Sequence, residues 1–104
     1  MNIQEIHWHD CKIRKVIELP ASERLLFEVD YPVDWEESDF QPHTIVFDEV
    51  FTYEIHEGPF TGSPTILSAS ETNHGPEGEL VVRLETSAGY RVIRCRSILL
   101  QKPE

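Results

Sequence analysis

The sequence has few basic residues, and a long stretch of it has none. It contains 9 Lys and Arg against 19 Asp and Glu, which gives a formal charge of −10. Proteins bind nucleic acid and anionic membranes chiefly through Lys and Arg, because these side chains neutralise phosphates and release counterions. A chain this acidic repels both surfaces. The charge balance therefore predicts neither nucleic acid nor a membrane as a partner.

Long apolar runs and cysteine clusters are also missing. No apolar run approaches the ~20 residues that span a bilayer, and the N-terminus lacks the basic-then-apolar layout of a signal peptide, so we expect a cytoplasmic protein. Cys11 and Cys95 lie 84 positions apart outside any CxxC pattern, which predicts two reduced, partly buried thiols rather than a disulfide. The length of 104 residues predicts one domain, residues 1–104.

The motifs of common catalytic sites are absent too. There is no GxSxG elbow, and the glycines at 58 and 62 have neither the spacing nor the lysine of a phosphate-binding loop. The carboxylate pairs Glu36-Glu37 and Asp48-Glu49 are adjacent in sequence, so on a strand their side chains face opposite ways. The sequence therefore predicts a protein that is not an enzyme, with no catalytic residues and no cofactor.

What the sequence does contain is strand-like alternation between turn residues. Residues 24–31 alternate Leu25, Phe27 and Val29 with polar positions, as a half-buried strand does. The expected strands are 12–19, 24–31, 43–56, 65–70, 79–86 and 90–101. No convincing helix is present. This spacing predicts an all-β fold, mainly antiparallel, either a sandwich or a strongly curved sheet or half-barrel of about six or seven strands.

Several segments carry more specific expectations. Residues 12–19 and 24–31 should form a hairpin, and 90–101, apolar on both faces, should lie centrally or cross between two layers. Residues 3–9 read as a strand or a loose arm, and 32–42, with two prolines, as a connecting loop. In 43–56 a bulge or break is expected near Asp48-Glu49, within an apolar face made by Ile45, Phe47, Phe51, Tyr53 and Ile55.

One short N-terminal segment has the residue types of a metal site. If His7-Trp8-His9-Asp10-Cys11 is extended, His7, His9 and Cys11 point to the same side, since side chains alternate along a strand. Two imidazoles and a thiol are suitable zinc ligands, although no second motif offers a fourth. The alternative is a partly exposed segment whose Trp8 packs inward and whose histidines are solvated.

The distribution of charge is more informative than its sum. Residues 25–82 contain no Lys or Arg but 13 acidic residues, whereas the other 46 residues carry all 9 basic and 6 acidic residues. The net charge is thus −13 in the central block and +3 in the two ends. If the fold preserves this segregation, one side of the molecule is strongly negative. The arginines of the C-terminal hairpin, Arg83, Arg91, Arg94 and Arg96, would then form a small positive patch.

Two interpretations of the acidic block remain open. The acids can simply keep a β-rich protein soluble and blunt its edges, with the arginines paired to Glu79 and Glu85. Alternatively, the segment around residues 34–40 is a docking surface in which aromatic anchors lie among carboxylates, a combination that favours fast association with a basic protein. The residues of this binding hypothesis are Asp34, Trp35, Glu36, Glu37, Asp39 and Phe40.

The chain also resembles a known group of bacterial proteins. The segments that carry the resemblance are WHDC at residues 8–11, DYPVDW at 30–35, IVFDEV at 45–50, GY at 89–90 and CRSI at 95–98. They are similar to landmarks of the immunity protein fifty group of polymorphic toxin systems. The resemblance implies an all-β domain and a toxin-neutralising role, and it supplies no catalytic residues.

Together these features predict a non-enzymatic interaction protein, immunity-like, that binds a basic protein partner through its acidic, aromatic-containing surface. Two alternatives stay open: a small metal-binding protein or metal-dependent enzyme that uses the N-terminal HxHxC segment, and a self-associating structural domain. Homodimer formation is also left open. Asp10 and Asp34 are further expected to hold turns through hydrogen bonds from their side chains to the backbone.

Overall fold

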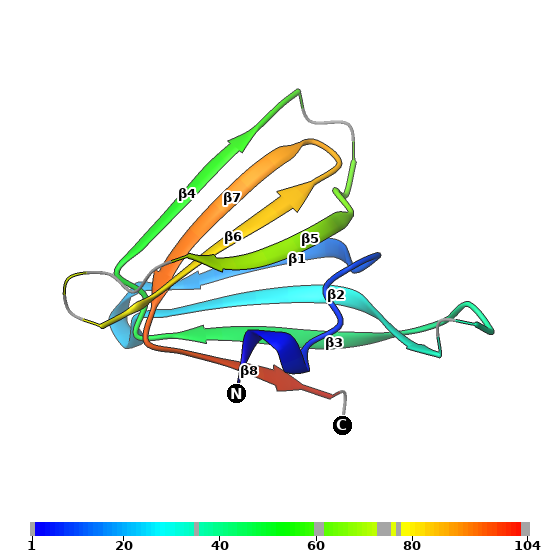
Figure 1. The fold of residues 1–104 in the computed structure, drawn as a ribbon, viewed down its shortest axis with the longest axis horizontal. Helices are drawn as coiled ribbons and strands as arrows, with labels where there is room; N and C mark the ends of the chain where they lie inside the picture. Colours follow the sequence, from blue (N-terminus) through cyan, green and yellow to red (C-terminus); the bar gives the residue numbers. More distant parts are fainter. Residues whose placement is uncertain (1, 35, 60–61, 73–75, 77, 103–104) are drawn as a thin grey trace.

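The computed structural model describes residues 2–34, 36–59, 62–72, 76 and 78–102. Within these ranges the chain forms eight strands in two four-stranded antiparallel sheets, and its only helical segments are two short 3-10 turns, η1 (Ile3–Glu5) and η2 (Pro20–Ser22) (Figure 1). The strands are β1 (Lys12–Leu19), β2 (Arg24–Asp34), β3 (Asp39–Asp48), β4 (Thr52–Glu57), β5 (Ile66–Thr72), β6 (Leu80–Thr86), β7 (Gly89–Cys95) and β8 (Ser97–Gln101). In this part of the chain no helix has the length and hydropathy needed to cross a membrane.

The two sheets pack as layers that do not close into a barrel. Sheet A has the strand order β1-β2-β3-β8, and sheet B has the order β4-β7-β6-β5. The chain passes from sheet A to sheet B between β3 and β4 and returns between β7 and β8 (Figure 1). A bridge between Lys12 and Thr65 joins the starts of β1 and β5. The predicted all-β antiparallel fold and the predicted hairpin, β1 with β2, are both confirmed.

The core follows the alternation of the sequence. In β2 the inward-facing Leu25, Phe27 and Val29 are at most 2 % exposed, whereas the residues between them face outward. Phe27 lies edge-on to Phe47 of β3, with ring centroids 5.2 Å apart. Aromatic pairs of this geometry stabilise a core beyond the area that they bury. The inner faces of the two sheets therefore supply one continuous core.

The long alternation of residues 43–56 is divided into β3 and β4, as predicted. Glu49, at the break, has a left-handed backbone with φ of 50°. The five apolar residues that alternate in the sequence do not share one face of the fold. The break re-aims the register, as expected, so Phe47 is fully buried whereas Phe51 is 45 % and Ile55 is 52 % exposed. The turn at Glu49 sends the chain into the other sheet and resets which side chains face the core.

The last expected strand is two strands, one in each sheet. β7 ends at Cys95 and β8 begins at Ser97, and the intervening Arg96 donates its backbone N–H to Asp48 O at 3.1 Å. Residues 90–101 were expected to lie centrally or to cross between layers, and the crossing is what the fold contains. This division, with that of residues 43–56, accounts for the eight strands.

The N-terminal segment is neither a strand nor a loose arm. It forms η1 and a turn, and it buries Ile3, Ile6 and Trp8. The indole Nε1 of Trp8 donates to Ile3 O at 2.8 Å, and its ring lies 6.3 Å from that of Phe47. A buried indole requires such an acceptor. The segment thus closes one side of the core with apolar side chains.

Gly89, at the start of β7, is required by a close approach of two backbones. Its φ is 151°, and a Cβ built there would lie 2.1 Å from the carbonyl oxygen of His56. We expect Gly89→Ala to lower the free energy of unfolding by about 1–3 kcal/mol, because either the backbone or β4 must move. Urea unfolding measures the loss. The control is Gly58→Ala, because a Cβ added at Gly58 meets nothing within 4 Å. Equal losses of stability in the two variants would contradict the predicted clash between the Cβ of residue 89 and the carbonyl oxygen of His56.

Candidate functional site

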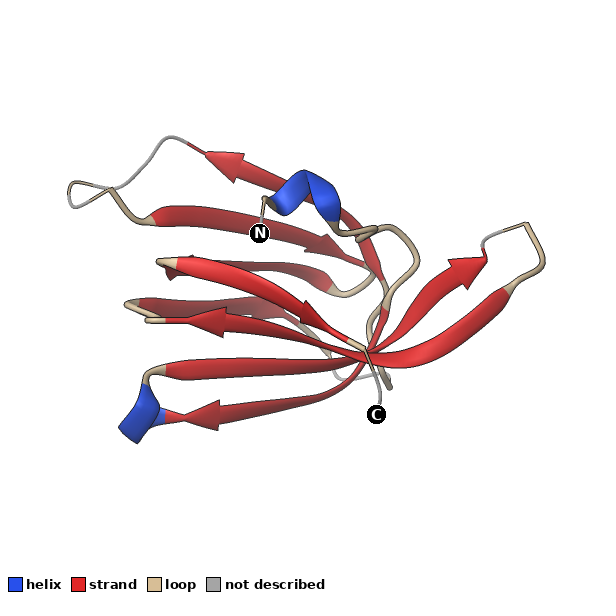
Figure 2. Cartoon of the chain, turned by 90° about the horizontal axis from the view of Figure 1, so that it is seen from below, coloured by secondary structure: helices blue, strands red, loops and turns tan. Residues whose placement is uncertain are grey.

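Residues 32–42 form a two-stranded arm that projects beyond the sandwich, and we call this segment the acidic arm. The sequence predicted a loop here, which is wrong: β2 continues to Asp34, β3 begins at Asp39, and Pro32 pairs with Phe40 (Figure 2). Every described residue from 33 to 42 is exposed. The arm therefore adds little to the core and presents both of its faces to solvent.

The two prolines made this segment look like a loop, and their positions explain why they are tolerated. Proline lacks a backbone N–H and is confined to strand edges. β1 pairs with β2 no further than Asp30, and β8 pairs with β3 no further than Thr44. Pro32 and Pro42 lie beyond these points, where each strand has a neighbour on one side only.

The tip of the arm is held by its own side chains. Asp34 Oδ1 accepts a hydrogen bond from the backbone N–H of Glu37 at 3.2 Å, as the sequence predicted for Asp34, and Ser38 has a left-handed backbone with φ of 55°. An aspartate that bonds the backbone a few residues ahead is typical of tight turns. The turn leaves the side chains of Glu36 and Glu37 exposed at the end of the arm.

The arm combines unneutralised carboxylates with exposed apolar side chains. Val33 is 43 % and Phe40 is 42 % exposed, while Trp35 lies outside the described residues. Within the part of the chain that the structure describes, no Lys, Arg or His forms an ion pair with the four arm acids, which are Asp34, Glu36, Glu37 and Asp39. The structure thus brings the described residues of the binding hypothesis, Asp34, Glu36, Glu37, Asp39 and Phe40, together on one projection.

All four arginines of the expected positive patch contact neighbouring side chains, and three of them, Arg83, Arg91 and Arg94, are in ion pairs. Arg83 Nε lies 2.5 Å from Glu85 Oε1 on the same strand, and Arg94 donates to the buried carboxylate of Glu79. Arg96 lies over the ring of Phe51, 5.4 Å from its centroid. The pairs with Glu79 and Glu85 are the alternative that the sequence left open.

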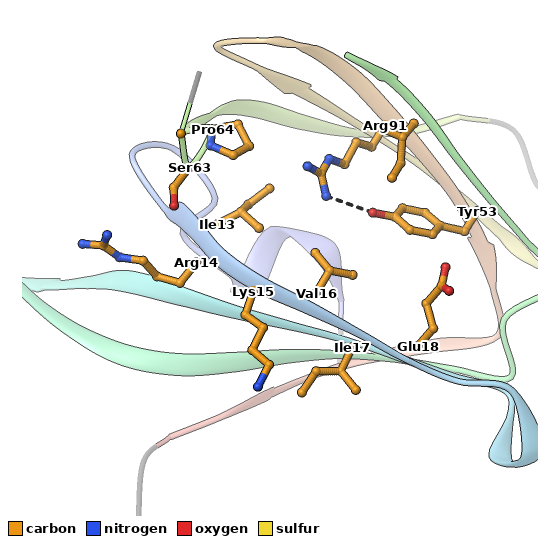
Figure 3. A pocket seen from close by; sticks show the side chains of 12 residues that line it. Ile13, Arg14, Lys15, Val16, Ile17, Glu18, Tyr53, Ser63, Pro64 and Arg91 are labelled. Atoms are coloured by element: carbon orange, nitrogen blue, oxygen red, sulfur yellow. Dashed lines mark hydrogen bonds between the residues drawn. The ribbon is translucent and has the colours of Figure 1, made fainter. Parts of the chain in front are cut away.

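A second feature, a cleft of about 910 Å³ between β1 and β4, was not predicted. Ile13 and Val16 of β1 form one wall, and Tyr53 and Arg91 line the other (Figure 3). Arg91 is buried in this cleft, where its Nη1 donates to Tyr53 Oη at 2.9 Å.

Arg91 belongs to a buried network that we call the buried quartet, which comprises Arg91, Glu57, Tyr53 and Thr86. The guanidinium binds the Glu57 carboxylate in bidentate fashion, from Nε to Oε2 and from Nη2 to Oε1, each at 2.8 Å. Thr86 Oγ1 donates to Glu57 Oε2 at 2.8 Å. Only 6 % of the Arg91 side chain and 7 % of the Glu57 side chain are exposed. These partners lie 34 residues apart, so no sequence motif could have revealed them.

The pKa values of the quartet favour fixed charges. Burial alone raises the pKa of Glu57, but hydrogen bonds from Arg91 and Thr86 outweigh it and lower that pKa overall. Burial lowers the pKa of Arg91, yet its bonds to Glu57 and Tyr53 raise it overall. Burial raises the pKa of Tyr53. None of these groups changes charge near neutral pH, so the quartet has the character of a structural ion pair.

The proposed metal ligands are not brought together. The segment from His7 to Cys11 is a turn in which Asp10 has φ of 74°, so the extended geometry that the metal hypothesis needed is wrong. His7 and His9 are exposed, whereas Cys11 is fully buried and its thiol donates to His7 O at 3.1 Å. Among the described residues there is no group of three or more His, Cys, Asp or Glu arranged to hold a metal ion.

Both cysteines are buried, free thiols. Burial raises the pKa of Cys11 to about 12 and that of Cys95 to about 12. The thiolate is the reactive form of cysteine, so both thiols are inert at neutral pH.

No protein-family model matches the chain, and no curated protein matches it either. The resemblance to the immunity protein fifty group therefore rests on the sequence segments alone.

Proposed function

We propose that the protein is a non-enzymatic interaction protein of the bacterial cytoplasm, an immunity-like inhibitor that binds a basic protein through its acidic arm. The observation that carries this proposal is the arm itself, a hairpin whose described residues from 33 to 42 are all exposed. Ordering each residue costs about 1–2 kcal/mol of conformational entropy, and an isolated two-stranded hairpin is marginal in water. A projecting hairpin with little core contact is best explained by contacts outside the molecule.

The chemistry of the arm specifies the kind of partner. Its four carboxylates create a local negative field, and such a field accelerates encounter with a positively charged surface. Phe40 and Val33 supply apolar area that a partner can bury, and interface hot spots combine such anchors with a polar surround. A basic protein, such as an enzyme whose surface is positive because its substrate is negative, fits both requirements.

The proposal is tested with the protein encoded by the reading frame next to this gene. We expect binding, and we expect the triple variant Glu36→Lys, Glu37→Lys and Asp39→Lys to slow association by about tenfold or more at low salt, because steering is lost. The salt dependence of the rate should also weaken. Stopped-flow kinetics at two ionic strengths measures both effects.

A matched control separates the arm from net charge. Replacing Glu5, Glu23 and Glu49 by Lys changes the total charge equally, from −10 to −4, but these exposed residues lie outside the arm. This control should keep most of the association rate. Equal rates in the two triple variants, or no binding by the wild-type protein, would contradict the proposal.

A further inference from the structure

The two sheets have four edge strands, and three of them are protected. β1 and β5 each carry a bulge, and β4 carries the exposed carboxylate of Glu54. Bulges and charges are the devices by which natural proteins keep an open edge from pairing with another chain. The fourth edge, β8, pairs with β3 over five residues in unbroken register. It contains no charged residue and no proline, although 27 % of the chain is charged. β8 is thus the one described edge strand with neither a bulge nor a charged residue.

β8 also ends an apolar stripe on the outer face of sheet A. Ile17 pairs with Leu26, Leu26 with Val46, and Val46 with Leu99, so each strand contributes one member. Val46 is 4 % exposed at the centre, whereas Leu99 is 47 % exposed at the edge. Because the stripe is exposed at the open edge of β8, a strand added to that edge would extend the stripe and bury Leu99.

We propose that β8 is a self-association edge, where a second copy of this chain adds its own β8 antiparallel to form one eight-stranded sheet. A two-fold axis at Leu99 places that residue opposite its equivalent, Ile98 opposite Leu100, and Ser97 opposite Gln101. Every pair joins side chains of like polarity, and the apolar stripe runs through both copies. Such an isologous contact is the commonest symmetric interface.

The distribution of charge favours a second copy of this chain at this edge. Two copies of a chain with net charge −10 repel one another, so they can meet only where the local surface lacks carboxylates, and β8 is such a surface. With the axis at Leu99, Arg96 of each copy lies opposite Lys102 of the other, so two positive charges meet at each end of the strand pair. Salt screens both repulsions, so this dimer strengthens as ionic strength rises, which is opposite to the behaviour expected for binding by the acidic arm.

The contact is small, so the expected dimer is weak. Two five-residue strands bury much less than the roughly 800 Å² per partner of a standard interface. We therefore expect weak association, with a dissociation constant on the order of 10–100 μM. Sedimentation equilibrium of the full chain should therefore show a monomer–dimer equilibrium at these concentrations, shifted toward dimer by salt. A monomer throughout the range up to about 500 μM would overturn the proposal.

A charged residue at the centre of β8 tests whether this edge forms the dimer. Leu99→Lys should weaken the dimer by about tenfold or more, because it sets two like charges across the axis. Leu67→Lys in β5 is the matched control, since Leu67 is also 47 % exposed, and it should leave the dimer intact. Equal effects of the two substitutions would refute the role of β8.

A cross-link gives a result that does not depend on how the lysine variant folds. Residues directly opposite across an antiparallel pair have Cβ atoms about 4.5–5.5 Å apart, which is close to the spacing of a disulfide. Leu99→Cys should form a covalent dimer under mild oxidation on a non-reducing gel, and Leu67→Cys should not. The native cysteines are buried and do not interfere. A monomeric Leu99→Cys protein, or equal cross-linking of both variants, would overturn the proposal.

Discussion

Replacing Arg91 with leucine is expected to lower the free energy of unfolding by about 3–5 kcal/mol. The substitution leaves the carboxylate of Glu57 buried without its bidentate partner, and a buried charge without a counter-ion is among the most destabilising arrangements in a protein. Since a domain of this size has a stability of roughly 5–15 kcal/mol, the variant should unfold at a clearly lower urea concentration. Urea titration followed by circular dichroism measures the change.

Two controls identify burial of the charge as the cause. Arg14 pairs with Asp30 at the surface, where 55 % of its side chain is exposed, so Arg14→Leu should cost no more than about 1 kcal/mol. The double variant Glu57→Gln with Arg91→Leu removes the buried charge itself and should recover a substantial part of the loss. No recovery in the double variant would show that packing, rather than charge, dominates.

The difference in the free energy of unfolding between the wild-type protein and Arg91→Leu should depend on pH. In the wild-type protein the pKa of Glu57 is lowered from 4.5, so its pairing stabilises the fold above that pH and fades as pH falls through the folded value. In Arg91→Leu, burial without a cation raises that pKa instead, so protonation stabilises the folded variant. The difference in stability between the two proteins should therefore be largest at pH 7 and narrow below about pH 5. A difference in stability that is the same at pH 7 and below pH 5 would contradict the role given to the Glu57 charge.

The fold was predictable where the sequence alternates. The hairpin of β1 and β2 follows from the alternation of residues 24–31, and the break near Glu49 follows from a charge that interrupts an alternating apolar face. The crossing at residues 90–101 follows from apolar residues on both faces. The acidic arm was missed as an element because two prolines in eleven residues usually mark a loop, and only the pairing limits of β1 and β8 show that these prolines have a free edge. The N-terminal turn was missed because it depends on the left-handed backbone of Asp10.

The candidate site was predictable in part. Composition located the acids and aromatics of the arm, because these residues are consecutive and their chemistry does not depend on the fold. The Arg91–Glu57 pair was not predictable, since it exists only because β4 and β7 are neighbours and both side chains point inward. The sequence alone does not indicate which of several carboxylates will pair with a given arginine. Local chemistry was thus accessible, whereas long-range pairing required the sheet order.

Replacing Phe47 with alanine is the second change with a large expected effect, a loss of about 3–5 kcal/mol in the free energy of unfolding. Phe47 is fully buried in β3 and its ring contacts both Phe27 and Trp8. The truncation removes the apolar area and leaves a cavity where the two sheets and the N-terminal segment meet, and close-packed surroundings cannot collapse to fill it. Thermal and urea unfolding should both register the loss.

Phe51 makes the matched control, because the alternation of the sequence placed both rings on one apolar face. Phe51 is 45 % exposed, so Phe51→Ala should cost only about 1 kcal/mol, including its contact with Arg96. The three residues between the two rings include Glu49, whose left-handed backbone redirects the chain from sheet A to sheet B. Losses of similar size at the two positions would mean that the apolar face runs on through residue 49, and the division into β3 and β4 would then be wrong.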